Sequence, residues 1–192
     1  MYSLLLDTHG QNVIIVLYKD GKVIDTIDMI SNNKHSVVLW PKIDEIFGNN
    51  NITVNDIKEV IVVNGPGSFT GVRIAVTVAK TMAYSLDIPI KSIDSLRILA
   101  VNVDGTSKVV AIPDKNGAFV GRFDDKNIEL GDYLYYNKQE YLDLLDKENI
   151  FEEENIKVDY NLVYDYLKGI APTNAHIVNP LYVKGITARN DK

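Results

Sequence analysis

Three short apolar segments open the chain and predict three strands. Residues 4–6 and 13–18 are strongly apolar, and residues 23–29 alternate apolar with polar side chains. Asp20 and Gly21 separate the second and third segments, and this pair is a strong signal for a two-residue hairpin turn. The sequence therefore predicts three strands that follow one another as a meander.

A helix is predicted after the meander. Residues 35–47 place apolar side chains at helical spacing, among them Leu39 and Ile43. Pro41 lies inside this span, where it removes a hydrogen-bond donor and clashes with the preceding turn. It must therefore kink the helix or mark the start of a second helical piece.

The stretch over residues 59–86 combines a strand, a glycine-rich loop and a second helix. Residues 60–63 are four consecutive β-branched side chains, which is typical of a strand buried on both faces. The next eight residues hold three glycines and a proline, so they continue neither a strand nor a helix. Ser68 or Thr70 can cap the helix that follows. Its first apolar face comprises Val72, Ala75, Val76, Ala79, Met82, Ala83 and Leu86.

The glycine-rich loop could cradle an anion, because such loops point backbone N–H groups and a helix N-terminus at one spot. It matches neither of two phosphate-loop patterns. A Walker loop requires Lys and then Ser or Thr after its last glycine, whereas Val72 and Arg73 follow here. A Rossmann loop places its third glycine one residue earlier. The spacing therefore favours a structural turn, formed by Gly65, Pro66, Gly67, Ser68, Phe69, Thr70 and Gly71.

A second, largely uncharged stripe runs along the same helix. A helix that is apolar on most of its circumference is covered on most of it, either by its own chain or by a partner. Arg73 is either a solvated charge or a group that binds an anion or a partner carboxylate. For the partner alternative we predict an interface formed by Leu39, Ile43, Arg73, Ile74, Val78, Thr81, Met82 and Ser85.

The rest of the chain alternates short strands and helices. A strand at residues 88–90 is followed by a helix that Asp94 or Ser95 caps. The second half is less regular, and its acidic run at residues 152–154 is interpreted as a solvated loop. Predicted strands there are residues 108–112, 118–123, 133–136 and 180–183, and predicted helices are residues 139–145 and 161–167.

Composition excludes several kinds of site. The net charge of −6 argues against a broad nucleic-acid surface, because phosphate binding needs clustered Lys and Arg. The chain contains no Cys, and its three His residues are far apart in sequence, so we expect no metal site. No apolar run approaches membrane length and no basic leader is present. We therefore expect a cytoplasmic protein.

The run from Gly65 to Ile74, GPGSFTGVRI, resembles the signature of the bacterial TsaB family. The resemblance extends over residues 3–101, and residues 180–183 are similar to the family's C-terminal Pro-x-Tyr-Leu-Arg ending. It implies an α/β, actin-like (ribonuclease-H-like) fold of the superfamily that includes Hsp70-like ATPases. We expect one full strand-helix lobe, the domain at residues 1–103, followed by a reduced second lobe, the domain at residues 104–192.

The resemblance also implies a function. Members of this family are non-catalytic dimerisation subunits that pair with TsaD, which transfers threonylcarbamoyl to the adenosine beside the tRNA anticodon. We accordingly expect a TsaE-like ATPase and tRNA to be reached only through the complex, no bound cofactor, and a homodimer when the chain is alone. The family's hairpin commonly carries Asp-x-Arg and then Glu-x-Tyr. Here Pro113 and Lys115 replace the Asp and Arg, and Ala118 and Val120 replace the Glu and Tyr, which leaves the role of the second lobe open.

An alternative is a small actin-like kinase or ATPase. In that class the acid that ends the first strand orders metal-bound water near the nucleotide phosphates. Asp7 and Thr8 are in the equivalent position, and a carboxylate with a hydroxyl suits hydrated Mg²⁺. An active member also needs a second glycine-rich hairpin, and Lys115, Asn116 and Gly117 lack its paired glycine. The sequence therefore predicts only a vestigial phosphate site.

Overall fold

The first sheet has the strand order of the actin-like class. The computed structural model describes residues 1–31 and 34–183. Its first sheet contains β1 (Tyr2–Asp7), β2 (Asn12–Lys19), β3 (Lys22–Ile30), β4 (Ile57–Val63) and β5 (Ile90–Ile93), in the order β3-β2-β1-β4-β5. The first three strands are antiparallel, and β4 and β5 run parallel to β1. This topology confirms the predicted meander and fold class.

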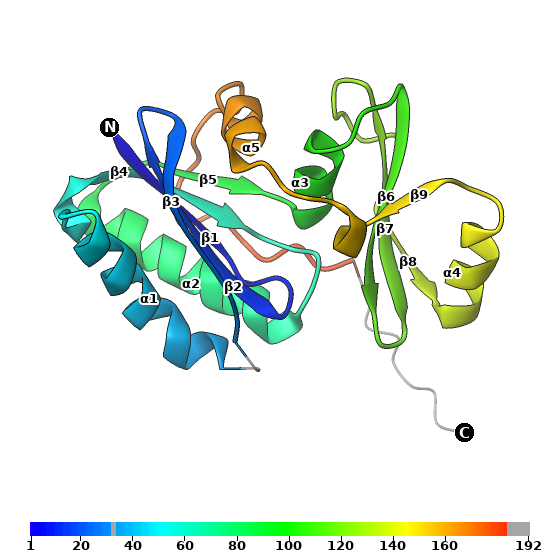
Figure 1. The fold of residues 1–192 in the computed structure, drawn as a ribbon, viewed down its shortest axis with the longest axis horizontal. Coiled ribbons are helices and arrows are strands. Elements are labelled where there is room, and N and C mark those ends of the chain that lie inside the picture. Colours follow the sequence, from blue (N-terminus) through cyan, green and yellow to red (C-terminus); the bar gives the residue numbers. More distant parts are fainter. Residues whose placement is uncertain (32–33, 184–192) are drawn as a thin grey trace.

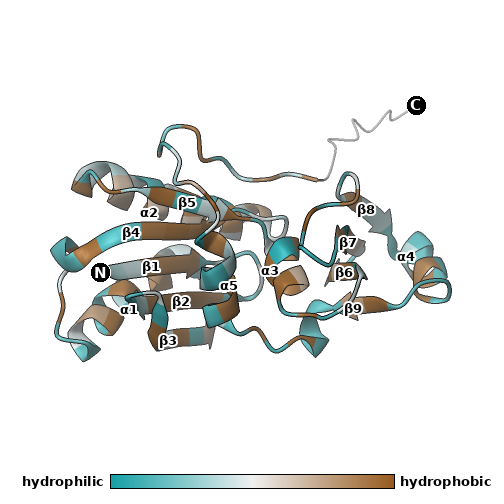
Figure 2. Cartoon of the chain, turned by 90° about the horizontal axis from the view of Figure 1, so that it is seen from above, coloured by the Kyte–Doolittle hydropathy of each residue, from teal (hydrophilic) through white to brown (hydrophobic). Residues whose placement is uncertain are grey.

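Helices cover both faces of this sheet (Figure 1). Side chains of a strand alternate between faces, so Leu4 and Leu6 contact one core while Leu5 contacts another. The Leu4 side packs against α1 (His35–Asn49) and α2 (Phe69–Leu86). The Leu5 side packs against α5 (Tyr160–Leu167). Strands β2 and β4 are correspondingly rich in apolar residues (Figure 2).

The second half of the chain forms its own sheet. This sheet contains β6 (Ser107–Asp114), β7 (Gly117–Asp124), β8 (Leu134–Asn137) and β9 (Ile150–Glu152), in the order β8-β7-β6-β9. The helix α4 (Lys138–Leu145) follows β8, and α3 (Ser95–Val101) joins the two sheets along the chain. Leu96 and Leu99 of α3 pack against Val110 and Phe123 of the second sheet.

The structure differs from the sequence predictions in a few elements. Pro41 lies inside one continuous helix, α1, which rules out the predicted alternative of a second helical piece. No strand forms at residues 180–183; instead Leu181 N–H donates to the carbonyl of Asn64 at 2.7 Å. The predicted helix at residues 161–167 is present as α5, but it packs on the first sheet. The division into domains at residues 103 and 104 stays a prediction.

Candidate functional site

The glycine loop packs directly against the end of β1. The Ser68 hydroxyl caps α2 by accepting from the N–H of Gly71 at 3.2 Å. Of the two predicted caps, Ser68 and Thr70, the structure therefore has Ser68. The Ser68 N–H donates to the carbonyl of His9 at 2.7 Å. A Cβ on Gly71 would overlap the carbonyl oxygen of Thr8, and one on Gly67 would overlap that of His9. These two glycines are therefore required for close approach of two backbones.

Asp7 and Thr8, the candidate phosphate-site residues, are both engaged inside the protein. The Thr8 hydroxyl donates to the carbonyl of Gly71 at 2.6 Å. Asp7 is 2% exposed, and its Oδ1 lies 2.9 Å from the N–H and 2.7 Å from Nδ1 of His9. His9 Nε2 lies 2.8 Å from Oε1 of Glu153, in the turn after β9. The imidazole therefore bridges two carboxylates from distant parts of the chain.

The two carboxylates favour the charged form of His9. Burial by itself would lower the pKa of His9, but the charges and hydrogen bonds of Asp7 and then Glu153 outweigh it. The pKa of His9 is consequently held well above its ordinary value. Asp7 thus has an internal counter-ion at the place where a metal-binding member of the class would need a free carboxylate. The prediction that residues 152–154 form a solvated loop was wrong for Glu153.

The cleft beside this cluster is acidic. It has a volume of about 930 Å³ and lies between β1–β3 and residues 153–161. Two basic or imidazole side chains, His9 and Lys157, lie among its described lining residues. The acidic lining residues are Asp7, Asp28, Glu153 and Asp159. A cleft with this balance of charge repels the phosphates of a nucleotide.

The hairpin of the second sheet is a tight turn. Strands β6 and β7 pair up to Asp114 and Gly117, which leaves two residues in the turn. The N–H of Asn116 donates to the carboxylate of Asp114 at 2.7 Å. Gly117 lies against the carbonyl of Tyr136 in β8, where any side chain would overlap it. Gly117 is therefore required for the close approach of β7 and β8.

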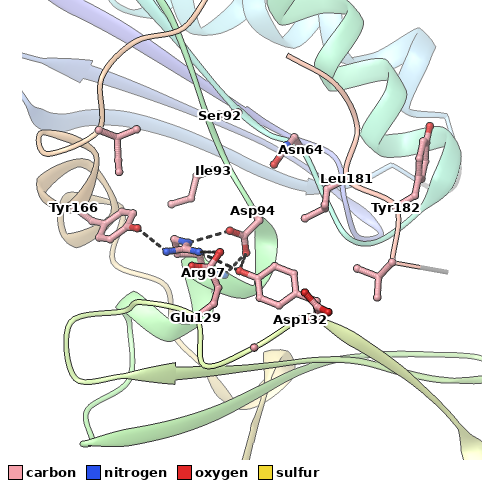
Figure 3. A pocket seen from close by; sticks show the side chains of 14 residues that line it. Asn64, Ser92, Ile93, Asp94, Arg97, Glu129, Asp132, Tyr166, Leu181 and Tyr182 are labelled. Carbon is pink, nitrogen blue, oxygen red and sulfur yellow. Dashed lines mark hydrogen bonds and ion pairs between the residues drawn. The ribbon is translucent and has the colours of Figure 1, made fainter. Parts of the chain in front are cut away.

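Arg97 joins the two sheets and α5, a role that the sequence analysis missed (Figure 3). Asp94 caps α3 and accepts from Arg97 Nε at 3.0 Å, while Arg97 Nη1 donates to Tyr166 Oη at 2.8 Å. Arg97 Nη2 pairs with Glu129, and Tyr133 Oη donates to Asp94 at 2.9 Å. The signal in the sequence was an arginine three residues after a helix cap.

The Arg97 network leaves little capacity for a ligand. It borders a cavity of about 700 Å³ that is also lined by Asn64 and Leu181. Burial raises the pKa of Asp94, against the opposing effect of Arg97. Burial and the neighbouring Asp94 also raise the pKa of Tyr133. Because the guanidinium already has acidic and phenolic partners, we interpret the network as a structural joint.

The predicted partner interface divides into buried and exposed residues. Leu39 and Ile43 of α1 are fully buried, and Val78 and Met82 of α2 are 8% and 3% exposed. All four belong to the core beneath the helices, and Val78 extends the buried side of α2 beyond the first apolar face that its spacing predicted. These four cannot present their side chains to a partner without repacking. The exposed or partly exposed members are Arg73, Ile74, Thr81 and Ser85.

The outer face of α1 and α2 carries apolar groups that the sequence analysis did not select. Val37 and Tyr84 are each 70% exposed, and Trp40 is 42% exposed. We define the α1–α2 face as the solvent-exposed side of these two helices, which lie side by side in Figure 1. Large exposed apolar groups on adjacent helices are typical of an interaction surface. In the sequence, these three apolar residues could have been recognised because they fall outside the buried stripe of each helix.

The described residues show neither a metal-ligand cluster nor a membrane-spanning helix. Residues 1–31 and 34–183 contain no group of three or more His, Cys, Asp or Glu placed to hold a metal ion. In the same ranges, every helix is too short or too polar to cross a membrane.

The fold and the Asp7–His9–Glu153 cluster define an actin-like protein whose first-strand carboxylate is paired with an internal imidazole. A crystal structure described as an uncharacterised protein with similarity to peptidase YeaZ, from Pseudomonas aeruginosa, has the same fold. Its TM-score is 0.77 at 17% identity, over 95% of this chain and 99% of that one. The tRNA threonylcarbamoyladenosine biosynthesis protein TsaB of Bacillus subtilis is 30% identical over 91% of this chain and 81% of that protein. The chain therefore belongs to the TsaB family.

Two further matches concern parts of the chain. TsaB of Buchnera aphidicola subsp. Schizaphis graminum is 36% identical over 97 residues, which are 50% of this chain and 46% of that protein. The family model described as TsaD, tRNA N6-adenosine threonylcarbamoyltransferase, matches residues 28–118. That range includes both helices of the α1–α2 face.

Proposed function

We propose that this chain is a non-catalytic subunit of tRNA threonylcarbamoyladenosine biosynthesis that pairs with a TsaD-like catalytic subunit. The observation that carries the non-catalytic part is the pairing of Asp7 with His9, 2.7 Å apart and buried. A metal at Asp7 would have to displace an imidazolium from a desolvated ion pair. The acidic cleft beside it opposes a nucleotide further. The alternative of an Asp7–Thr8 kinase or ATPase lacks comparable support.

The partner surface in this proposal is the α1–α2 face. The TsaD model matches residues 28–118, so this chain resembles its proposed partner over the two helices themselves. Two proteins that share such a helix pair can meet through equivalent faces, which would form a packing of four helices. The same face would support a homodimer when the chain is alone, and the two assemblies would compete. The domain that follows residue 103 would then lie away from this contact.

The remaining partners are reached through the complex. A net charge of −6 gives the chain little counterion release with tRNA, so we propose that tRNA and a TsaE-like ATPase bind the assembled complex. The test is reconstitution with the TsaD-like and TsaE-like proteins of the same organism. Threonylcarbamoyl transfer to tRNA should require this chain and should persist with Asp7→Asn. Full transfer without the chain would refute the proposal.

A further inference from the structure

Two parts of the chain contact the guanidinium of Arg73. They are the first turn of α2 and residues 179–182, here called the C-terminal segment. Arg73 Nε donates to the phenolic oxygen of Tyr182 at 2.6 Å. The guanidinium carbon lies 3.9 Å from the ring centre of Phe69, one helical turn before it, and 5.6 Å from that of Tyr182. The two rings are themselves 5.3 Å apart. Arg73 is thus held by aromatic contacts on its own helix and on the C-terminal segment.

The glycine loop fixes the C-terminal segment in this position. Asn64 accepts from the N–H of Leu181 at 2.7 Å and donates its side-chain amide to the carbonyl of Asn179 at 3.1 Å. A Cβ on Gly65 would come within 2.9 Å of the carbonyl oxygen of Leu181. Gly65 therefore allows the approach that brings Tyr182 to Arg73. The loop and the C-terminal segment together orient one side chain.

Two nitrogens of the oriented guanidinium have no hydrogen-bond partner among the described residues. Within residues 1–31 and 34–183, Arg73 makes one hydrogen bond, through Nε, and no ion pair. Arg73 also lies near the N-terminal end of α2, where the helix dipole disfavours a cation. The stability of α2 therefore does not explain why Arg73 is fixed by aromatic contacts at this position.

Arg73 lines a basic groove beside the α1–α2 face. The groove has a volume of about 740 Å³ and lies between α2 and residues 179–182. Its charged lining residues are Arg73 and Lys80, and none of the described lining residues is acidic. Lys80 is already committed to the carbonyls of Val178 at 2.8 Å and His176 at 3.3 Å. Thr81 belongs both to the groove and to the exposed side of α2, so the groove is continuous with that face.

We propose that the Arg73 guanidinium receives a carboxylate side chain, an Asp or Glu, of the protein that covers the α1–α2 face. This inference rests on the proposed function and names the chemistry of its contact. A planar fork whose two Nη nitrogens have no partner among the described residues suits a carboxylate through paired hydrogen bonds. One guanidinium on a chain of net charge −6 is a poor anchor for nucleic acid. The observations therefore favour a protein carboxylate over a tRNA phosphate.

The test is the affinity for the TsaD-like subunit of the same organism, measured by calorimetry. Arg73→Gln should weaken binding about tenfold or more, because the partner carboxylate is left desolvated and unpaired. Arg73→Lys keeps the charge but not the fork, so it should restore binding only partly. Lys22→Gln is the matched control, since it removes one positive charge from the exposed β2–β3 hairpin. It should change the affinity less than about twofold.

A double-mutant cycle tests the positioning role of Tyr182. Tyr182→Phe removes the hydroxyl that accepts from Arg73 and should weaken binding several-fold. The same change should have no further effect in the Arg73→Gln background if it acts through the guanidinium. An equal loss in both backgrounds would show that Tyr182 acts independently, which contradicts the proposed convergence.

The outcomes separate this inference from the proposed function. If the wild-type chain does not bind the TsaD-like subunit, the proposed function fails and this contact fails with it. If wild type and Arg73→Gln bind equally while both remain folded by circular dichroism, only the Arg73 contact is overturned. If Arg73→Gln keeps its heterodimer affinity but lowers the affinity of the complex for tRNA, the anion is a phosphate. That result would also overturn the carboxylate assignment.

Discussion

The Nδ1 atom of His9 lies 2.7 Å from Oδ1 of Asp7, and both side chains are buried. This pair occupies the end of β1, where an actin-like ATPase needs an available carboxylate. The second ring nitrogen of His9 is held by Glu153 at 2.8 Å, so the imidazole has no freedom to withdraw without breaking two contacts. The actin-like fold is therefore retained while the carboxylate at the end of β1 is engaged inside the protein.

The first prediction concerns nucleotide turnover. With Mg²⁺ and ATP, the purified chain should release no more phosphate than its Asp7→Asn variant, because Asp7 is already paired with His9. The measurement is a coupled phosphate-release assay over a range of Mg²⁺ concentrations. A Mg²⁺-dependent rate that Asp7→Asn abolishes would show that Asp7 serves a metal, contrary to this account.

The second prediction is a pH dependence of stability that is specific to His9. Its pKa is raised in the folded chain, so the folded state binds the proton more tightly than the unfolded state. The stabilisation is complete below the unfolded pKa of about 6.5 and is lost as pH rises through the folded pKa. The stability difference between wild type and His9→Gln should therefore shrink with rising pH.

Urea unfolding at stepped pH measures that difference. His176→Gln is the control, because His176 is exposed and lies outside the Asp7–Glu153 cluster. It should leave the pH dependence of the wild type unchanged. A difference between wild type and His9→Gln that stays constant from about pH 6 to about pH 9 would contradict a protonated His9 in the folded state.

The third prediction compares two glycines in helices. Gly71→Ala places a Cβ onto the carbonyl oxygen of Thr8 and should destabilise the chain by about 1–3 kcal/mol or more. Gly48→Ala meets nothing within 4 Å and should stabilise it by roughly 0.5–1 kcal/mol through helix propensity. Thermal unfolding of both variants tests the pair. Equal effects would mean that the glycine loop does not need its close contact with β1.

Local patterns predicted the first lobe because its determinants are local. The alternation along β3 and the turn at Asp20 and Gly21 specify strands and a hairpin from adjacent residues. The spacing on α2 identified the buried side but not its width. Val78 was therefore placed only in the partner stripe and Met82 in both faces, although both side chains are buried in the core. That width depends on how closely α1 packs beside α2, which no single helix encodes.

Long-range contacts explain what the sequence did not reveal about the site. His9 and Glu153 are 144 residues apart, and Arg73 and Tyr182 are 109 residues apart. Each pair depends on where a later segment returns to the first sheet. Glu153 was expected in a solvated loop because an acidic run is usually solvated. The return of that segment to the end of β1 is a property of the whole fold.

The central claim is that the α1–α2 face binds a TsaD-like subunit. Val78→Asp does not test it, since that carboxylate would be buried in the chain's own core and should lower the melting temperature of the monomer. Thr81 is exposed on α2, so Thr81→Glu should leave the monomer folded. Within the complex that charge would be desolvated against the partner, which costs free energy of association.

The most direct measurement is therefore the Kd of the heterodimer for wild type and Thr81→Glu, with circular dichroism melting of both free chains. The account predicts similar melting temperatures and a Kd that rises about tenfold or more for Thr81→Glu. A folded Thr81→Glu variant that binds the TsaD-like subunit with the affinity of the wild type would contradict it.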